Sequence, residues 1–427
     1  MIFSLTVTAQ SSGSGEELLD ELDDFDSLFD EDSDFQDQEQ DEDTQASEEQ
    51  LNPDEDDLLT QTSRNSKVSV NGNFRFIGGL SSGWNYTPWD PGESEGDSMD
   101  NSALMDMRSN LSLNFQVGPQ FRVLQKYTIK FPDFDIEVEE FFCDYNFNNS
   151  LFMRLGRQNL TWGISRNYPF TNLPGRVPDN FNSSVEDDYG DRMDLSDSYA
   201  AKFSIPYKLG GFEFLGFTRR GFFPEGSDTP SADSIGYGFN YNHASTMGDF
   251  TVGSYYMPQM KYRSFYSFST TLFGSLELYQ EGLFAYDVHD IYEDEDYAFS
   301  ANIGLFYEMF KGRLKLSTEY FYNGEKNELD VKRTQFPLIT GHNTSSALSW
   351  RFSKLKTTAY SQVKYNVNEN TGLFIPGLRY NGIPYVDINL ATPLVWGSKD
   401  GTYYVNNPDD NDRPFSVILT ITLSGKI

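Results

Sequence analysis

The chain has 427 residues and a formal net charge of −33, and 38% of its residues are hydrophobic while 16% are aromatic. No run of about 18 apolar residues occurs, which excludes a transmembrane helix. The single cysteine, Cys143, excludes an intrachain disulfide, a cysteine-based zinc site and a CxxC redox pair.

The first nine residues resemble the end of a secretory signal. A short apolar stretch is followed by Val7, Thr8 and Ala9, which resemble the small-residue cleavage site of a signal peptide. Residues 1–9 are therefore predicted to be the remnant of a signal peptide, with an arbitrary apolar N-terminus as the alternative.

Residues 10–66 are predicted to be an acidic disordered segment. Residues 11–57 carry 22 Asp and Glu and no Lys or Arg, which leaves 43 acids and 32 bases, or −11, for the remainder. Such a segment buries too little apolar surface to offset the entropy lost on ordering. Apolar residues at helical spacing leave open an amphipathic helix that docks on a basic partner or on the mouth of the domain that follows: Leu18, Leu22, Phe25 and Phe29.

From about Lys67 to residue 427 the hydrophobic pattern has a period of two. Residues 105–117 show it most clearly, with an apolar face made of Met105, Met107, Leu111, Leu113, Phe115 and Val117. Residues 121–131 repeat it, with Arg122, Lys126 and Lys130 on the polar face. Alternation over about ten residues is typical of a transmembrane β-strand, in which one face meets lipid and the other meets the lumen.

The connections between these segments alternate in length. All the long connections are odd-numbered along the chain: 83–102, 161–193, 221–233, 288–295, 324–344 and 397–412. The even-numbered connections are short turns, such as Gly118-Pro119 and Asn381-Gly382. A barrel that spans an outer membrane predicts this parity, whereas a soluble sandwich does not. The pattern predicts an antiparallel up-and-down transmembrane β-barrel over 67–427, with about 18 strands, or 16 if the connections near 132 and 258 are bulges.

Two smaller features fit the barrel. The residues around Glu137–Asp144 switch parity, and a β-bulge near Glu139 and Glu140 would reconcile them. Aromatic residues recur near predicted strand ends and are expected to form girdles at the lipid–water interfaces: Tyr255, Tyr256, Tyr320, Tyr322, Trp350, Phe352 and Trp396.

One segment supports a resemblance to a known family. Residues 151–163 read Leu-Phe-Met-Arg-Leu-Gly-Arg-Gln-Asn-Leu-Thr-Trp-Gly and precede a long polar loop. This arrangement resembles bacterial outer-membrane porins, most closely those of the alginate-export and related substrate-channel type. The resemblance implies an 18-stranded channel whose extracellular loops fold partly inward, and it does not transfer a substrate.

On this register, charged side chains line the lumen. The basic candidates are Arg75, Arg108, Arg122, Lys126, Lys130, Arg154, Lys315, Arg351, Lys356, Lys364 and Arg379. The acidic candidates are Asp106, Glu308, Glu319 and Asp387. Five of these bases lie on neighbouring strands and are expected to form a basic stripe on one side of the lumen: Arg108, Arg122, Lys126, Lys130 and Arg154.

The loop at 161–193 carries Glu186, Asp187 and Asp188, and these acids would face the basic stripe across a constriction if the loop folds inward. The alternative is that the wall charges pair with one another and the loop stays outside.

The sequence therefore predicts a porin for passive diffusion of small hydrophilic solutes, in a bacterial outer membrane, with its acidic segment in the periplasm. Its expected partners are outer-membrane lipid, the barrel-assembly machinery and further copies of itself, and no nucleic acid. No cofactor, metal site or catalytic motif is evident, so an enzyme is not expected. The alternative function is an adhesin or binding protein that uses its long extracellular loops.

Overall fold

The computed structural model of the chain describes residues 66–84, 99–131, 135–158, 160, 162–168, 199–218, 235–257, 261–286, 296–324, 341–397, 403 and 415–426. The predicted signal remnant and the acidic segment before Ser66 lie outside these residues. No helix in the described part of the chain is both long and apolar enough to cross a membrane.

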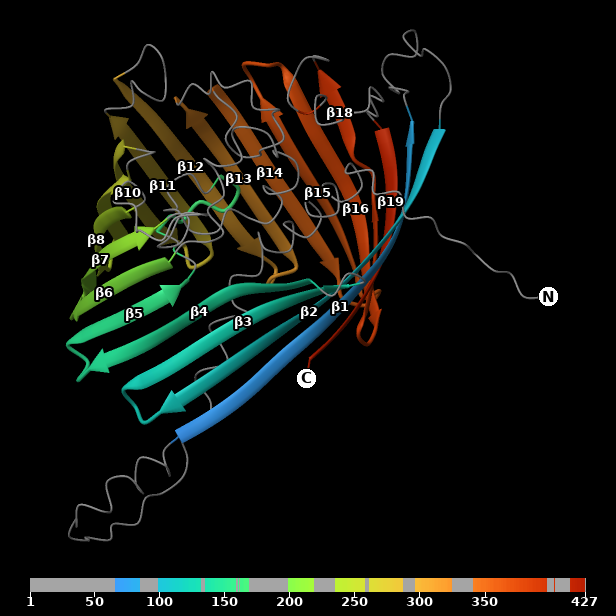
Figure 1. The fold of residues 1–427 in the computed structure, drawn as a ribbon. Helices are drawn as coiled ribbons and strands as arrows, with labels where there is room; N and C mark the ends of the chain where they lie inside the picture. The colour runs from blue at the N-terminus through green and yellow to red at the C-terminus, as the bar shows by residue number, and fades with distance from the viewer. Residues whose placement is uncertain are drawn as a thin grey trace, which may run out of the picture.

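The described residues form antiparallel strands joined in chain order (Figure 1). Their bounds are β1 (Ser66–Trp84), β2 (Met99–Val117), β3 (Phe121–Phe131), β4 (Asp135–Phe147), β5 (Leu151–Arg157), β6 (Tyr199–Tyr207), β7 (Gly210–Thr218), β8 (Ile235–Ser245), β9 (Gly248–Met257), β10 (Lys261–Leu272), β11 (Leu276–Tyr286), β12 (Tyr297–Met309), β13 (Leu314–Asn323), β14 (Gly341–Phe352), β15 (Thr357–Asn366), β16 (Thr371–Ile383), β17 (Val386–Ala391), β18 (Leu394–Gly397) and β19 (Phe415–Lys426).

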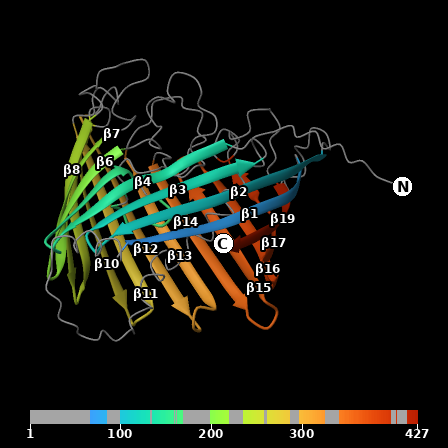
Figure 2. The ribbon, with the colours of Figure 1, turned by 60° about the horizontal axis from the view of Figure 1, so that its bottom comes forward.

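The sheet closes on itself. Apart from β17 and β18, each strand pairs with its neighbour in sequence, and β1 also pairs with β19, from Asn73 opposite Lys426 to Trp84 opposite Phe415. Figure 2 shows β1–β4 crossing in front of the opposite wall. Because β17 and β18 both pair with β16 and β19, they occupy one position in the wall, and the barrel has 18 strands. This confirms the predicted fold.

The break between β17 and β18 falls at Thr392-Pro393. Proline has no backbone N–H to give to a neighbouring strand, so the ladder is interrupted there. Hydrogen bonds on both sides hold the gap closed, with Thr392 N donating to Pro376 O at 3.0 Å and Ser416 N donating to Pro393 O at 3.1 Å. The sequence pattern did not predict this break.

The strand count resolves to 18 rather than 16, because β3 pairs with β4 and β9 pairs with β10 as separate antiparallel strands. The predicted bulge is confirmed, since Lys126 faces Glu140 and Tyr127 faces Val138, which leaves Glu139 as the extra residue.

The turn predicted at Asn381-Gly382 was wrong. The chain reverses at residues 384–385, where Tyr385 has a φ of 64°. Asn381 N instead donates to Lys356 O at 2.9 Å, so the strand continues past the Asn-Gly pair.

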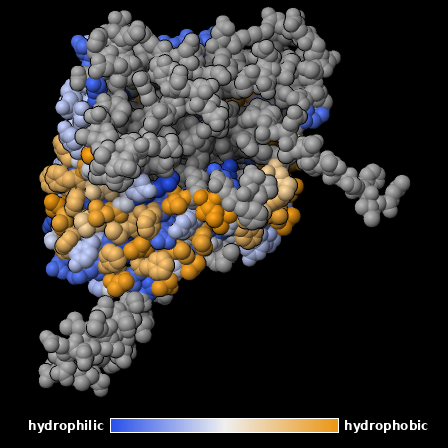
Figure 3. Space-filling model, in the orientation of Figure 1, coloured by the Kyte–Doolittle hydropathy of each residue, from blue (hydrophilic) through white to orange (hydrophobic). Residues whose placement is uncertain are grey.

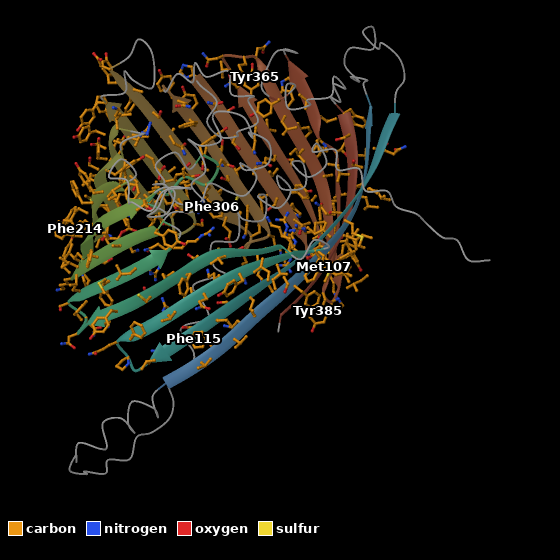
Figure 4. All side chains as sticks on the ribbon, in the orientation of Figure 1. Met107, Phe115, Phe214, Phe306, Tyr365 and Tyr385 are labelled. Atoms are coloured by element: carbon orange, nitrogen blue, oxygen red, sulfur yellow. The ribbon has the colours of Figure 1, made fainter. Side chains whose placement is uncertain are left out.

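The two faces of the wall differ in composition. Along β13, Ser317, Glu319, Phe321 and Asn323 are buried inside the barrel, whereas Tyr320 between them is 41% exposed. The outer face carries exposed apolar side chains throughout, including Val70, Leu80, Met105, Phe214, Phe239, Phe284, Ile303, Leu390 and Ile421. Figure 3 shows hydrophobic residues gathered over the outer surface of the strands nearest the viewer, and Figure 4 places Phe214 at the outer edge and Phe306 within the barrel.

Aromatic rings form bands on the outer face at both ends of the barrel. Near the long connections, Tyr237, Tyr256, Tyr262 and Tyr286 follow one another with ring centroids 4.6–5.5 Å apart. Near the short turns, the ring of Tyr207 stacks on Tyr241 at 5.9 Å. Such girdles mark the two interfaces of a bilayer.

Tyr255 does not belong to either girdle, although the sequence placed it there. It faces inward and is 2% exposed, because its position in β9 has the parity of the lumen.

Candidate functional site

A row of charged side chains crosses the inner face of β3–β6. Arg122, Asp144, Arg154 and Lys202 stand opposite one another on successive strands. Asp144 is shared by two guanidinium groups, with Arg122 Nη2 at 2.5 Å from Oδ2 and Arg154 Nε at 2.7 Å from Oδ1. The Arg154 guanidinium also lies 4.0 Å above the centre of the Phe142 ring. These contacts hold both arginines against the wall.

A second group of bases lies nearer the other end of the same wall. Arg75, Arg108 and Lys130 are cross-strand neighbours on β1, β2 and β3. Between the two rows, Lys126 Nζ lies 2.8 Å from Glu140 Oε2. The predicted bases Arg108, Arg122, Lys126, Lys130 and Arg154 therefore share one wall, called the basic wall below. Glu186, Asp187 and Asp188 lie outside the described residues.

The acids that pair with the basic wall were not identified from the sequence. Asp144 and Glu140 lie within the stretch where the bulge at Glu139 shifts the parity by one residue, so their face was ambiguous from sequence. Glu213 on β7, which lies 3.4 Å from Lys202 Nζ, was also missed. The charges of the basic wall therefore pair with one another, and the described start of the loop that follows β5 also lies inside the barrel.

That loop follows β5. We call residues 158–168 the inner loop, of which Gln158, Leu160 and Trp162–Tyr168 are described. Gln158 Nε2 donates to Ala200 O at 3.1 Å, and Trp162 Nε1 donates to Glu213 Oε2 at 3.1 Å. The Trp162 ring stacks on Phe265 with centroids 5.4 Å apart, inside a buried apolar cluster that also includes Leu215 and Leu283.

Two carboxylates on the far wall bind the backbone of the inner loop. Glu281 on β11 accepts hydrogen bonds from Ile164 N and from Ser165 N, the latter at 3.1 Å. Glu319 on β13 accepts from Arg166 N at 2.8 Å and from Asn167 N at 3.1 Å. Four consecutive amides therefore point at buried carboxylates, an arrangement that stabilises negative charge.

Side chains add to this attachment. Arg166 Nη2 lies 2.8 Å from Glu277 Oε2, and its guanidinium lies 4.0 Å above the Phe306 ring. The Tyr168 ring stacks on Phe321 at 5.0 Å. Burial and the nearby Glu319 carboxylate raise the pKa of Tyr168, so its hydroxyl stays neutral.

The Glu319 carboxylate is itself positioned by neighbours on the wall. Tyr279 Oη donates to its Oε1, and Asn302 Nδ2 donates to Oε2 at 3.2 Å. The Tyr279 ring lies over Gly304, where a Cβ would come within 2.1 Å of Tyr279 Cζ. Glycine at 304 therefore gives the ring its place.

The two charged regions lie on opposite sides of the barrel. In a ring of 18 positions, β3 and β12 are half a circumference apart, so the basic wall faces Glu277, Glu281 and Glu319. Glu319 was predicted from sequence, whereas Glu277 and Glu281 were missed. A separate apolar cluster on the inner face of β14–β19 includes Tyr360 and Ile375, with Tyr403 packed against it. Within the described residues, no His, Cys, Asp and Glu group together as metal ligands.

These features define a class of protein: a membrane-spanning β-barrel with an apolar, aromatic-banded exterior and a charged lumen that contains a fixed inner loop. No protein-family model matches this chain, and no curated protein matches it.

Solved structures with a similar arrangement include one from work on the asymmetric conductivity of engineered proteins, at 12% identity and a TM-score of 0.42. Another is a triple mutant of the Rhodopseudomonas blastica porin, at 11% identity and a TM-score of 0.41. Each similarity covers 84% of this chain and 100% of the other chain.

Proposed function

We propose that this protein is an outer-membrane porin through which small hydrophilic solutes diffuse. The observation that carries the proposal is the charged inner surface enclosed by 18 strands, a number at which a barrel leaves an aqueous channel. A plugged carrier of apolar solutes would need an inner face without these ion pairs.

The orientation follows from the connections. Outer-membrane barrels place short turns in the periplasm and long loops outside. With this orientation, β1 starts in the periplasm, and so does the acidic segment that precedes it. The likeness of residues 151–163 to alginate-export and related channels supports a substrate-channel type of porin, with the solute still to be identified.

The inner loop supports a size limit on the solute. It occupies part of the lumen at the level of Glu281 and Glu319, and its attachment to one side leaves the basic wall as the face that passing solutes meet. Solutes are thus expected to be selected by size and by charge.

Single-channel recording in a planar bilayer tests the proposal. Refolded protein should give discrete, long-lived conductance steps, and a salt gradient should give a reversal potential set by the lumen charges. Insertion without conductance would contradict the porin and favour the adhesin. A cooperative soluble fold that does not insert would contradict the membrane-spanning barrel itself.

A further inference from the structure

Four exposed bases gather on two neighbouring turns of the barrel. The eight short turns, all at the end where β1 begins, contain five bases and no Asp or Glu. Lys208 lies alone on the β6–β7 turn. The other four lie on the β12–β13 and β14–β15 turns, and we call them the turn cluster: Lys311, Arg313, Lys354 and Lys356. All four side chains are exposed.

The two turns of the cluster are close together. The strands between them, β13 and β14, are paired, and Arg351 N donates to Arg313 O at 2.7 Å. Strands about 4.8 Å apart place the two turns roughly 10 Å from each other. Glu308, the acid nearest in sequence to Lys311, stands opposite Lys315 on the inner face of the wall. The turn cluster therefore concentrates positive charge at one place on the rim of the barrel.

The outer face directly beside the cluster is aromatic. Phe310 is 62% exposed, and its ring centroid lies 5.6 Å from that of Trp350. The Trp350 ring lies 6.3 Å from Phe352, and both share the outward parity of the exposed Leu348 on β14. Tryptophan rings on a membrane protein favour the level of the lipid headgroups. The bases follow these rings toward the end of the barrel, so they lie at the level of the lipid phosphates.

The chain holds bulky side chains in these turns at a conformational cost. Phe310, Lys311 and Lys356 have φ of 56°, 59° and 49°. This left-handed region is the usual place of Gly or Asn, because a larger side chain is strained there. The β4–β5 turn obeys that preference, with Asn148 and Asn149 at φ of 53° and 60°. Turn formation alone does not require Phe or Lys at these positions, so their side chains point to a contact outside the barrel.

An anionic phospholipid has the chemistry that this surface requires. Its phosphate accepts charge-assisted hydrogen bonds from Lys and Arg, while its acyl chains meet the aromatic rings. Each base near an anionic membrane surface strengthens binding about five-fold. A soluble acidic protein would also attract the bases, but it would not cover rings that are continuous with the outer face of β14. The combination of charge and aromatic rings therefore favours lipid.

We propose that the turn cluster, with Phe310 and Trp350 beside it, is a binding site for anionic phospholipid headgroups in the leaflet next to the short turns. The site rests on the barrel spanning a bilayer and is independent of conduction. Lipids of this kind should collect at β12–β15 in preference to the rest of the barrel surface.

Quenching of tryptophan fluorescence by brominated lipids tests the site in the full refolded chain. One variant keeps Trp350 as its only tryptophan and is placed in bilayers that mix phosphatidylcholine with phosphatidylglycerol. Bromine on the acyl chains of one lipid at a time reports which lipid lies beside the ring. Phosphatidylglycerol should bind there several-fold more strongly than phosphatidylcholine, and 1 M salt, with a Debye length of about 3 Å, should reduce this preference.

Two controls make the result specific to the cluster. Replacing its four bases with Gln should bring the relative affinity of the two lipids to about one, whereas Lys208→Gln, an exposed base on a distant turn, should leave the preference intact. A second reporter keeps Trp396 as the only tryptophan. Trp396 lies opposite Gly372, at the other end of the same outer face, and its ring stacks on Tyr365. It should show no preference for either lipid.

The salt dependence of the chain with native bases gives an answer even if the four-base variant does not fold. Equal quenching of Trp350 by the two lipids, or a preference that Trp396 shares, would overturn the site. Equal quenching combined with salt-dependent binding of soluble polyglutamate to the cluster would show that it recognises an acidic protein segment, and the lipid site would be wrong. A barrel that does not conduct but prefers phosphatidylglycerol at Trp350 would contradict the porin and leave the lipid site standing.

Discussion

Cys143 and Asp144 are adjacent in β4 but lie on opposite sides of the barrel wall. The Asp144 carboxylate binds two arginines of the lumen, while Cys143 has the parity of Phe141, which is 46% exposed on the outer face. In a bilayer, Cys143 should therefore resist a charged, water-soluble thiol reagent. An Asp144→Cys, Cys143→Ser variant should react, and its conductance should fall as the reagent attaches.

The comparison contains its own control, because the two thiols differ by a single position. Equal reaction of both thiols in vesicles would contradict the assignment of the two faces. A bilayer-soluble maleimide should reverse the preference and label the native Cys143.

The shared carboxylate predicts opposite shifts in ion selectivity. Replacing Asp144 with Asn leaves Arg122 and Arg154 without their counter-ion and should favour anions. Replacing both arginines with Gln leaves a lone carboxylate and should favour cations. A unit charge about 8 Å from a passing ion in water contributes about 0.5 kcal/mol, so the permeability ratio should change roughly two-fold for Asp144→Asn, which removes one charge, and roughly five-fold for the double arginine variant, which removes two.

Reversal potentials under a salt gradient measure both shifts. Changes in the same direction for the two variants would show that Asp144 and its arginines do not line the conducting path.

The attachment of the inner loop predicts a noisy channel when Glu319 is altered. In a Glu319→Gln variant, one of the two carboxylate oxygens becomes an NH₂ group that cannot accept a hydrogen bond, so Arg166 N, Asn167 N, Tyr279 Oη and Asn302 Nδ2 must share a single acceptor oxygen. Each buried N–H that loses its partner costs about 1–3 kcal/mol. The loop should leave the wall part of the time, and open-channel current should fluctuate between levels.

Trp162 reports this detachment independently of current. In a variant with Trp162 as its only tryptophan, iodide should quench the fluorescence more after the Glu319→Gln change. Glu308→Gln is the matched control, since Glu308 lies on the inner face of β12, nearer the turns. A steady open-channel current and unchanged iodide quenching of Trp162 in the Glu319→Gln variant would contradict the role of Glu319 in holding the inner loop.

A second route to the same phenotype starts at Gly304. The Cβ of a Gly304→Ala variant would overlap the Tyr279 ring, so the ring must move and its hydrogen bond to Glu319 is lost. Overpacking of this kind costs about 1–3 kcal/mol, measurable by urea unfolding in detergent or vesicles. The variant should share the fluctuating current of Glu319→Gln, and a Tyr279→Phe variant should show it without the steric strain.

Local patterns explain why the barrel could be predicted from the sequence. The inside–outside alternation of β2 and β3 has a period of two, and both the face of Arg122 and the face of Phe115 follow from it. Long connections and short turns alternate along the chain, which separates the two ends of the barrel. The bulge appears in the sequence as a one-residue shift of the inside–outside alternation near Glu139. These signals depend on residues close together in the chain.

The site was less predictable because it is built from contacts far apart in sequence. Nothing near Glu281 shows that it will meet the backbone of Ile164, 117 residues earlier. The Asn381-Gly382 pair carries a strong local turn signal, yet Tyr380 pairs with Thr357 of β15, Asn381 N donates to Lys356 O, and the strand runs on to Ile383, which pairs with Val386 of β17. In both cases the observed structure depends on contacts with residues that are distant in the sequence, so a short stretch of sequence does not reveal it.

The pairing of β1 with β19 sets a condition on how this molecule forms. Asn73 must find Lys426, so the last bonds of the wall join the two most distant strands in the chain. Contacts with such a large sequence separation form slowly, because the loop-closure entropy comes before the gain. Until β1 pairs with β19, both strands have unpaired edges that can form hydrogen bonds with other chains. The pairing of β1 with β19 is therefore expected to be the slowest step of folding. Mutations along this pair of strands should change the yield of folded protein more than the conductance of the folded barrel.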